Sequence, residues 1–162
     1  MARHAFFSFH YQNDIWRASQ VRNAWVTRDR DTAGFWDAAD WESVKRGGES
    51  AIERWIENQL DGTSVTVVLI GSQTAERKFV KYEIRRSHEL GKGLLGVRIH
   101  RLKDRNGLTS SAGLNPFEAF YIETNGRRKH LSEIYPIYDW VANDAYENFA
   151  DWVEQAARDA GR

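Results

Sequence analysis

The chain has 162 residues, and its 23 Lys and Arg residues balance its 23 Asp and Glu residues. A chain of this length should form one domain over residues 1–162 that buries roughly 70% of its unfolded surface without metal or disulfide support. The absence of cysteine excludes disulfide scaffolds and cysteine-ligated zinc sites. The balanced charge argues against direct nucleic-acid binding, which normally needs a basic excess.

Hydropathy and aromatic content narrow the class further. No apolar run reaches the ~18 residues of a membrane span, and the N-terminal sequence MARHAFFSFHYQND turns polar too soon for a signal peptide. We therefore expect a soluble, cytoplasmic protein with no membrane partner. Aromatic residues make up 13% of the chain and include seven Trp, more than a small core needs, which indicates a stacking surface or an interface.

A strand followed by a helix is predicted at the start of the chain. Residues 5–9 (AFFSF) are a short apolar run, which is typical of a buried strand. Asp14 can cap the helix that follows, because one helical face then collects Ala18, Val21 and Trp25.

A long loop and a second helix come next. Residues 28–46 are charged and irregular, which predicts a loop with a short strand at 34–36. Apolar residues recur at helical spacing over 49–60, and Asp61 and Gly62 provide a stop signal.

The middle of the chain predicts the centre of a parallel sheet. Residues 65–70 (VTVVLI) are β-branched and apolar without alternation, as in a strand covered on both faces. A helix over 74–90, ended by Gly91, and a strand over 94–99 follow. This order gives βαβ units with right-handed crossovers.

The last third is harder to interpret. Residues 102–115 predict a polar loop, and two weak strand candidates follow at 119–123 and 134–138, between which the pattern does not choose. A final helix is predicted from Val141 to the end. The fold class is therefore α/β, with a doubly wound, mostly parallel five-stranded sheet and helices on both faces.

Several common site motifs are absent from the sequence or lie in the wrong structural context. The stretch GKGLLG (91–96) matches the dinucleotide pattern but precedes a strand, whereas phosphate binding needs it before a helix. The five His residues show no metal-ligand spacing, and no P-loop or serine-hydrolase elbow occurs. We therefore predict no metal site. The central strand ends in Leu69, Ile70, Gly71 and Ser72, which excludes a phosphoacceptor Asp there.

Ligands of open α/β sheets bind beyond the carboxyl ends of the strands. Residues 8–10 and 71–73, the loop from Trp36 and the loop after Ile99 should meet there. Glu83 lies beside the apolar stripe of the helix over 74–90, within reach of such a crevice. Taken alone, it is more often a surface residue paired with Arg86 or Arg77.

The order of several segments points to a family. These segments are FFSFHYQND, KRGGESAIERWIENQLDGTSVTVVLIGS and TAERKFVKYEI, with GLNPF (113–117) and YDW (138–140) further on. Over Phe6 to about Asp104 the chain resembles a Toll/interleukin receptor (TIR) domain, and it is most similar to the TIR-like ThsB proteins of bacterial Thoeris antiphage systems. The loop DAADWESVKRGG lacks the Arg-Asp and Pro-Gly pair of many receptor TIR domains, which argues against receptor-style pairing with adaptors.

The resemblance implies a flavodoxin-like fold and a function. Such proteins cleave NAD at the nicotinamide ribose and release a cyclic or conjugated ADP-ribose, which diffuses to and activates a partner effector. NAD is then a substrate, and no cofactor is implied. Carried over position by position, the catalytic glutamate falls on Glu83, and the substrate-binding positions fall on Phe6, Phe7, Ser8, His10 and Asn115.

The chemistry suits a single carboxylate. Cleavage of the N-glycosidic bond develops positive charge on the ribose, while nicotinamide leaves as a neutral group and needs no general acid. Aromatic rings could stack on a base, and Asn115 could donate to a ribose or phosphate oxygen. The alternatives are core packing for Phe6 and Phe7, a turn role for His10 and an X-Pro loop role for Asn115.

Two other functions stay open. A non-catalytic TIR-like interaction module would use the aromatic surplus, and a nucleotide-binding sensor would hold an ADP-ribose-like ligand without turnover. Trp36 and Trp41 lie in the segment that TIR domains use for association, so we also expect a weak homo-oligomer.

Overall fold

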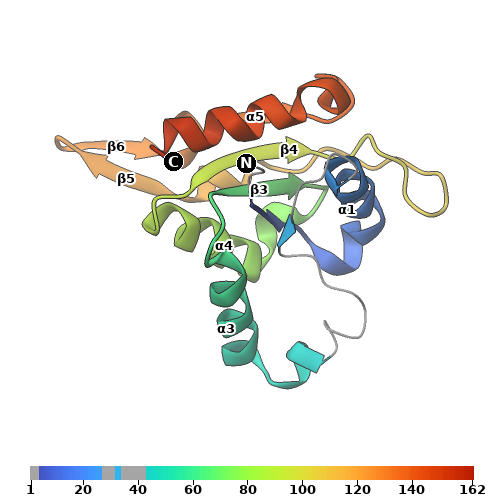
Figure 1. Ribbon diagram of the computed structural model, residues 1–162, viewed down its shortest axis with the longest axis horizontal. Helices are drawn as coiled ribbons and strands as arrows, with labels where there is room; N and C mark the ends of the chain where they lie inside the picture. The colour runs from blue at the N-terminus through green and yellow to red at the C-terminus, as the bar shows by residue number, and fades with distance from the viewer. Residues whose placement is uncertain (1–3, 27–31, 34–42) are drawn as a thin grey trace.

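A parallel sheet in the order β2-β1-β3-β4-β7 forms the centre of the molecule (Figure 1). The computed structural model describes residues 4–26, 32–33 and 43–162. All four neighbouring strand pairs are parallel. The strands are β1 (Ala5–Ser8), the two-residue β2 (Thr32–Ala33), β3 (Val65–Ile70), β4 (Gly93–Arg98) and β7 (Ile137–Asp139).

The predicted strands at 5–9, 65–70 and 94–99 are confirmed to within one residue at each end. Strand β3 lies between β1 and β4, and all six of its residues are buried. Its β-branched, non-alternating sequence follows from this position, because both faces of a central parallel strand are covered.

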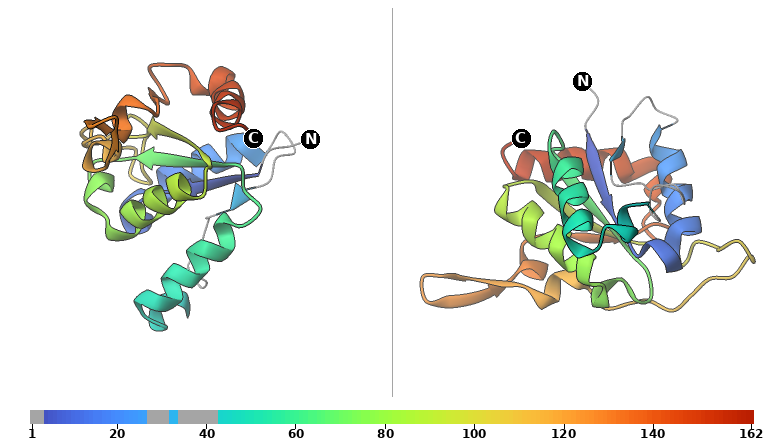
Figure 2. Two further views of the ribbon diagram at one scale, coloured as in Figure 1. Left: turned by 90° about the vertical axis from the view of Figure 1, so that its left-hand side faces the viewer. Right: turned by 90° about the horizontal axis from the view of Figure 1, so that it is seen from below.

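Helices cover both faces of the sheet (Figures 1 and 2). Side chains of α1 (Tyr11–Val26) and α5 (Ala145–Asp159) pack with β1, β3 and β4 in one buried cluster. The opposite face packs against α3 (Glu49–Leu60) and α4 (Lys78–Glu89). The architecture is therefore α/β with a parallel sheet between two layers of helices.

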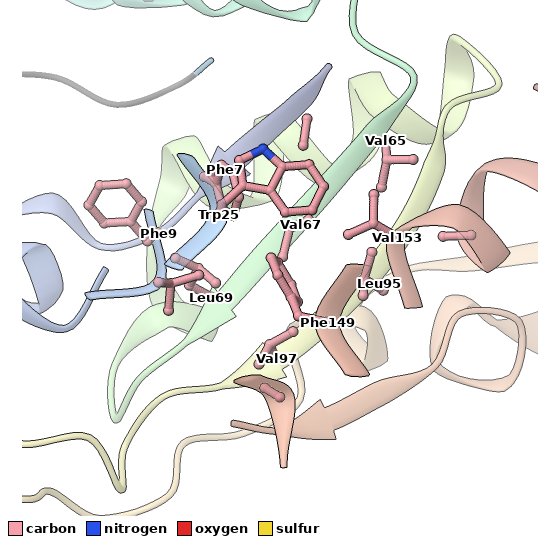
Figure 3. Packing of buried hydrophobic residues seen from close by; sticks show 14 of the residues in the cluster. Phe7, Phe9, Trp25, Val65, Val67, Leu69, Leu95, Val97, Phe149 and Val153 are labelled. Atoms are coloured by element: carbon pink, nitrogen blue, oxygen red, sulfur yellow. The ribbon is translucent and has the colours of Figure 1, made fainter. Parts of the chain in front are cut away.

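Alternation along β1 divides the core between the two faces. Phe7 lies near the rings of Trp25 and Phe149, with centroids 6.3 and 6.2 Å away (Figure 3). Phe6 points to the other face and packs with Ile52 and Ile56 of α3. Residue Ser8, two positions after Phe6, therefore shares the face of α3 and α4.

Two helix predictions need correction. The helix expected over 74–90 is divided into a 3-10 turn, η1 (Thr74–Glu76), and α4, because Arg77 between them is extended. The last helix begins at Ala145 rather than Val141, since the Asp139 carboxylate holds the preceding residues in a turn by accepting from the Val141 and Ala142 N–H groups at 3.0 Å.

The prediction that Asp14 caps its helix is wrong, because Asp14 is a buried residue within the first turn of α1.

The GKGLLG stretch connects α4 to β4. Gly91 follows the end of α4 with φ 70°, and Gly93 begins β4, so these glycines end a helix and open a strand, as the sequence predicted. A Cβ on Gly93 would lie 2.6 Å from the Ala156 carbonyl oxygen, so glycine here allows α5 to approach the sheet.

The two weak strand candidates both form strands, but in different sheets. Residues 134–138 contribute β7, the edge strand of the main sheet. Residues 119–123 contribute β5 (Tyr121–Thr124), which forms a separate antiparallel hairpin with β6 (Arg127–His130). Strand β6, with the sequence RRKH, was not predicted because it contains no apolar residue.

The helices of the described residues include none that is long and apolar enough to span a membrane.

Candidate active site

The order in which strands are added to the sheet changes direction between β1 and β3. From β1 the chain passes through α1 to β2 at one edge, and from β3 it passes through α4 to β4 on the other side. The two connecting helices lie on opposite faces. Such a reversal leaves an opening at the carboxyl ends of the two strands, where ligands of open α/β sheets bind.

Glu83 is buried below this edge and bonded to β1. The Ser8 hydroxyl donates to Glu83 Oε1 at 2.7 Å, and Glu83 is only 7% exposed. The expectation of a partly exposed Glu83 paired with Arg86 or Arg77 is therefore wrong. Arg86 instead contacts Glu57 at 2.6 Å and Glu89 at 2.7 Å on the outer side of α4.

No cation among the described residues pairs with Glu83, so no nearby positive charge lowers the pKa of its carboxyl group. Burial raises the pKa of Glu83 to about 8, and the hydrogen bond from Ser8 offsets only part of the rise. At neutral pH the side chain is mostly a protonated acid. A buried carboxyl group without a compensating charge, at the ligand edge of the sheet, is typical of a functional site.

His10 lies just beyond the end of β1 and is 8% exposed. Its Nδ1 atom is buried and has no hydrogen-bond partner among the described residues. Burial, with a smaller contribution from Arg77, lowers the pKa of His10, so the imidazole is neutral at pH 7. The His10 carbonyl also accepts from the Asp14 N–H at 2.8 Å, so the residue takes part in the turn into α1 as well.

Asp14 is a further buried carboxyl group at this edge, and the sequence analysis did not include it among the candidate site residues. Its side chain is fully buried one turn after His10, and burial raises its pKa despite Arg17 at 3.4 Å. A Cβ on Gly71 would lie 2.2 Å from Asp14 Oδ2, so the carboxyl group packs directly against the backbone that follows β3. The polar run HYQND directly after an apolar strand was the signal that could have found it.

Arginines hold the loop after β4 against this edge. Arg17 donates from Nε to the Leu102 carbonyl at 2.8 Å and from Nη2 to the Leu108 carbonyl at 2.9 Å. Further along, Arg98 donates to the Gly113 carbonyl at 2.6 Å. A Cβ on Gly113 would lie 2.1 Å from the Gly71 carbonyl oxygen, which shows how closely the GLNPF segment packs on the end of β3.

Asn115 begins the short 3-10 helix η2 (Pro116–Ala119) in this segment. Its Oδ1 accepts from the Phe117 N–H at 2.9 Å, so the amide carbonyl serves as a helix cap. Phe117 is fully buried against the face that carries α4. The half-buried Asn115 side chain is therefore fixed in orientation.

The structure places the two aromatic candidates in the core. Phe6 and Phe7 are 0% and 1% exposed, and only Phe6 lies on the face that carries Glu83. The predicted strand at 34–36 and the side chains of Trp36 and Trp41 lie outside the described residues. Within the described ranges, no group of three or more His, Asp or Glu side chains is arranged to hold a metal ion.

This arrangement of segments matches a known family. The family described as Thoeris protein ThsB, TIR-like domain, matches residues 6–104. The chain belongs to this ThsB family. The resemblance predicted from FFSFHYQND to FVKYEI is thereby confirmed over the same span.

A full-length relative supports the same assignment for this ThsB-family chain. It is ThsB1 of Bacillus cereus (strain MSX-D12), whose provisional name is cyclic ADP-D-ribose synthase. The two proteins are 38% identical over 191 residues, which cover 94% of this chain and 100% of the relative. The similarity therefore extends beyond residue 104 and includes the loop after β4 and the β5–β6 hairpin.

The raised pKa of Glu83 predicts how stability changes with pH. The folded state keeps a proton that the unfolded chain loses above its ordinary pKa of 4.5, so the free energy of unfolding falls as pH rises from 4.5 to about 8 and then levels off. Glu83→Gln cannot ionise and escapes this loss. We expect the variant to match the parent near pH 4.5 and to exceed it by a few kcal/mol at pH 8.

Urea unfolding of both proteins across this pH range measures the difference. Glu76→Gln, which removes an exposed carboxylate from η1, is the matched control and should follow the parental curve. Parallel curves for the parent and Glu83→Gln would show that the carboxyl group is ionised at neutral pH in the folded protein.

Proposed function

We propose that this protein cleaves NAD and makes cyclic ADP-ribose as a signal in Thoeris antiphage defence. The bond between nicotinamide and ribose breaks, a nucleophilic nitrogen or hydroxyl group of the same molecule bonds to the ribose carbon, and nicotinamide and one proton are released. The diffusing product activates a partner effector. Family membership and the name of the B. cereus relative support this reaction class, and the buried Glu83 carboxyl group is the observation that carries it.

We further infer that residues 1–162 act as one flavodoxin-like, doubly wound TIR-like domain in the cytoplasm, where NAD is available. The strand order β2-β1-β3-β4-β7, with helices on both faces, supports this fold assignment. Weak self-association through Trp36 and Trp41 stays a prediction from the sequence.

The role of Glu83 follows from the charge that develops during cleavage. The ribose becomes cationic as nicotinamide departs, so a fixed carboxylate near the ribose hydroxyls stabilises the transition state more than the ground state. Ser8 donates to Oε1 of this carboxyl group, and the second oxygen would then act on the ribose. Water is excluded around Glu83, which strengthens this electrostatic effect.

The ionisation of Glu83 should be coupled to substrate binding. In the free protein, burial favours the protonated acid. The nicotinamide ring of NAD carries a positive charge, and a cation next to a carboxyl group lowers its pKa. Bound NAD would therefore release the proton from Glu83, so that the buried negative charge exists only when the substrate compensates it.

The remaining candidates would orient the acceptor. The neutral His10 ring and the amide of Asn115 can hold a nucleotide in place by hydrogen bonds, and a well-placed acceptor group of the same molecule competes with water for the ribose cation. Of the two aromatic candidates, Phe6 shares the face of Glu83, and because it is fully buried it would support the site by packing against α3. Phe7 supports the site from the opposite side of the sheet.

Replacement of Glu83 tests the proposal directly. Glu83→Gln keeps the size of the side chain but removes the charge, so product formation should fall on the order of 10²-fold or more. Glu83→Asp keeps the carboxylate but shortens the side chain by one methylene group, and it should retain more activity than Glu83→Gln. Chromatography of NAD, nicotinamide and cyclic ADP-ribose, from purified protein and from expressing cells with and without phage infection, measures both.

Glu76→Gln, which removes an exposed carboxylate, should keep parental activity. A folded Glu83→Gln protein with the parental rate would refute the role of Glu83. Infected cells that express the parent but neither consume NAD nor accumulate a cyclic product would refute the enzyme assignment itself.

The pH profile of the reaction gives a second test. Because the free protein must lose a proton before Glu83 can act, kcat/KM should rise about tenfold per pH unit below pH 8 and then level off. The value of kcat should depend less on pH, since bound NAD already lowers the pKa of Glu83. Steady-state kinetics across this range would contradict the account if kcat/KM were flat or fell as pH rises.

A further inference from the structure

The β5–β6 hairpin is a charged surface that the proposed reaction does not use. It projects from one end of the body, away from the sheet (Figure 1). We call residues 121–130 the basic arm, because Arg127, Arg128 and Lys129 are exposed there against one acidic residue, Glu123. Arg127 and Lys129 are two residues apart on one strand and therefore share a face.

The basic arm is built as a defined structure. Asn125 and Gly126 form its turn with φ angles of 54° and 75°, the left-handed pair that suits a two-residue hairpin. The Arg128 guanidinium lies 4.0 Å from the centre of the Tyr121 ring, which holds the strands together. At the base, the His130 N–H donates to Glu133 Oε2 at 2.7 Å.

The cations of the basic arm are not neutralised within the molecule. Among the described residues, Arg127, Arg128 and Lys129 form no ion pair. With Thr124, Asn125 and Glu133 they border a hollow of about 380 Å³. These exposed cations are therefore available to acidic groups of a partner.

A complementary surface lies on α5 of the same chain. Asp144, Glu147 and Asp151 are exposed at the start of α5, where Asp144 is the N-cap and the other two, four residues apart, lie on one side of the helix. We call them the acidic stripe. Like charges at this spacing destabilise a helix slightly, and in the described part of the chain none of the three pairs with a cation.

We propose that the basic arm of one copy binds the acidic stripe of a second copy. Arg127 and Lys129 are separated by about 6.6 Å along their strand, and Glu147 and Asp151 by about 6 Å along their helix, so the two pairs match in spacing. The arm and the first turns of α5 lie toward opposite ends of the molecule (Figure 1). An arm therefore reaches the stripe of a neighbour and not its own.

This geometry makes the contact head to tail. Each copy uses its arm at one end and its stripe at the other, so that the assembly extends by addition of further copies. The contact depends on exposed charges, which makes it weak and sensitive to salt. It uses neither Glu83 nor the segment that contains Trp36 and Trp41, so it is independent of the proposed function.

Charge reversal on each surface tests the proposal. Sedimentation and light scattering of the full chain should show self-association that grows with protein concentration and is lost at high salt. Arg127→Glu with Lys129→Glu should weaken it at least about tenfold, and so should Glu147→Lys with Asp151→Lys. Arg54→Glu with Lys81→Glu, a reversal of two exposed cations on α3 and α4, is the matched control and should leave association unchanged.

A mixture of the arm variant and the stripe variant tests whether the partner of the basic arm is a second copy of this chain. Arms and stripes of opposite charge then meet again, so the mixture should associate although neither variant does alone. A parent that stays monomeric at every concentration and low salt would overturn the proposal. So would a mixture that stays monomeric, or an arm that binds an anionic polymer such as heparin while the parent does not self-associate.

Discussion

The contact between Ser8 and Glu83 joins the first strand of the sheet to the helix that follows the central strand, and the candidate site depends on it. Glu83 is placed in the protein interior at a cost, because no cation in the described part of the chain compensates its charge. In the free protein the fold offsets that cost by keeping the group protonated, and in the proposed reaction the proton leaves only when a cationic substrate binds. A carboxyl group that is neutral at rest and charged with substrate is suited to NAD, whose reactive end is cationic.

The rest of the structure explains how this group is held. Strand β3 is buried on both faces and fixes the position of β1 on one side and of β4 on the other. Because Phe6 and Phe7 are buried on opposite faces of β1, a slip of the strand by one residue would exchange their places between two differently packed clusters. Arg17 and Arg98 then hold the loop after β4 at the carboxyl edge, which brings the GLNPF segment to the end of β3. The site is thus assembled from segments that are far apart in sequence.

Sequence patterns predicted those parts of the fold that depend on local periodicity. The helix at Glu49–Leu60 and the strand at Val65–Ile70 have the predicted bounds, because one has a clear apolar stripe and the other a continuous β-branched run. Strand β6 was missed because its pairing is set by the Asn125-Gly126 turn and not by apolar residues. The burial of Glu83 and Asp14 could not be predicted, since a polar residue beside an apolar stripe is buried or exposed according to what packs on it. The resemblance to ThsB proteins singled out Glu83 where periodicity alone favoured a surface ion pair.

The protonation state of Glu83 with and without NAD tests the central claim most directly. Infrared difference spectra between the parent and Glu83→Gln, with glutamate labelled at the carboxyl carbon, report whether that one group is an acid or a carboxylate. The account predicts the acid in the free protein at neutral pH and the carboxylate once NAD, or an analogue with a cationic nicotinamide ring, is bound. A carboxylate in the free protein, or an acid that persists when the site is saturated with the dinucleotide, would contradict it.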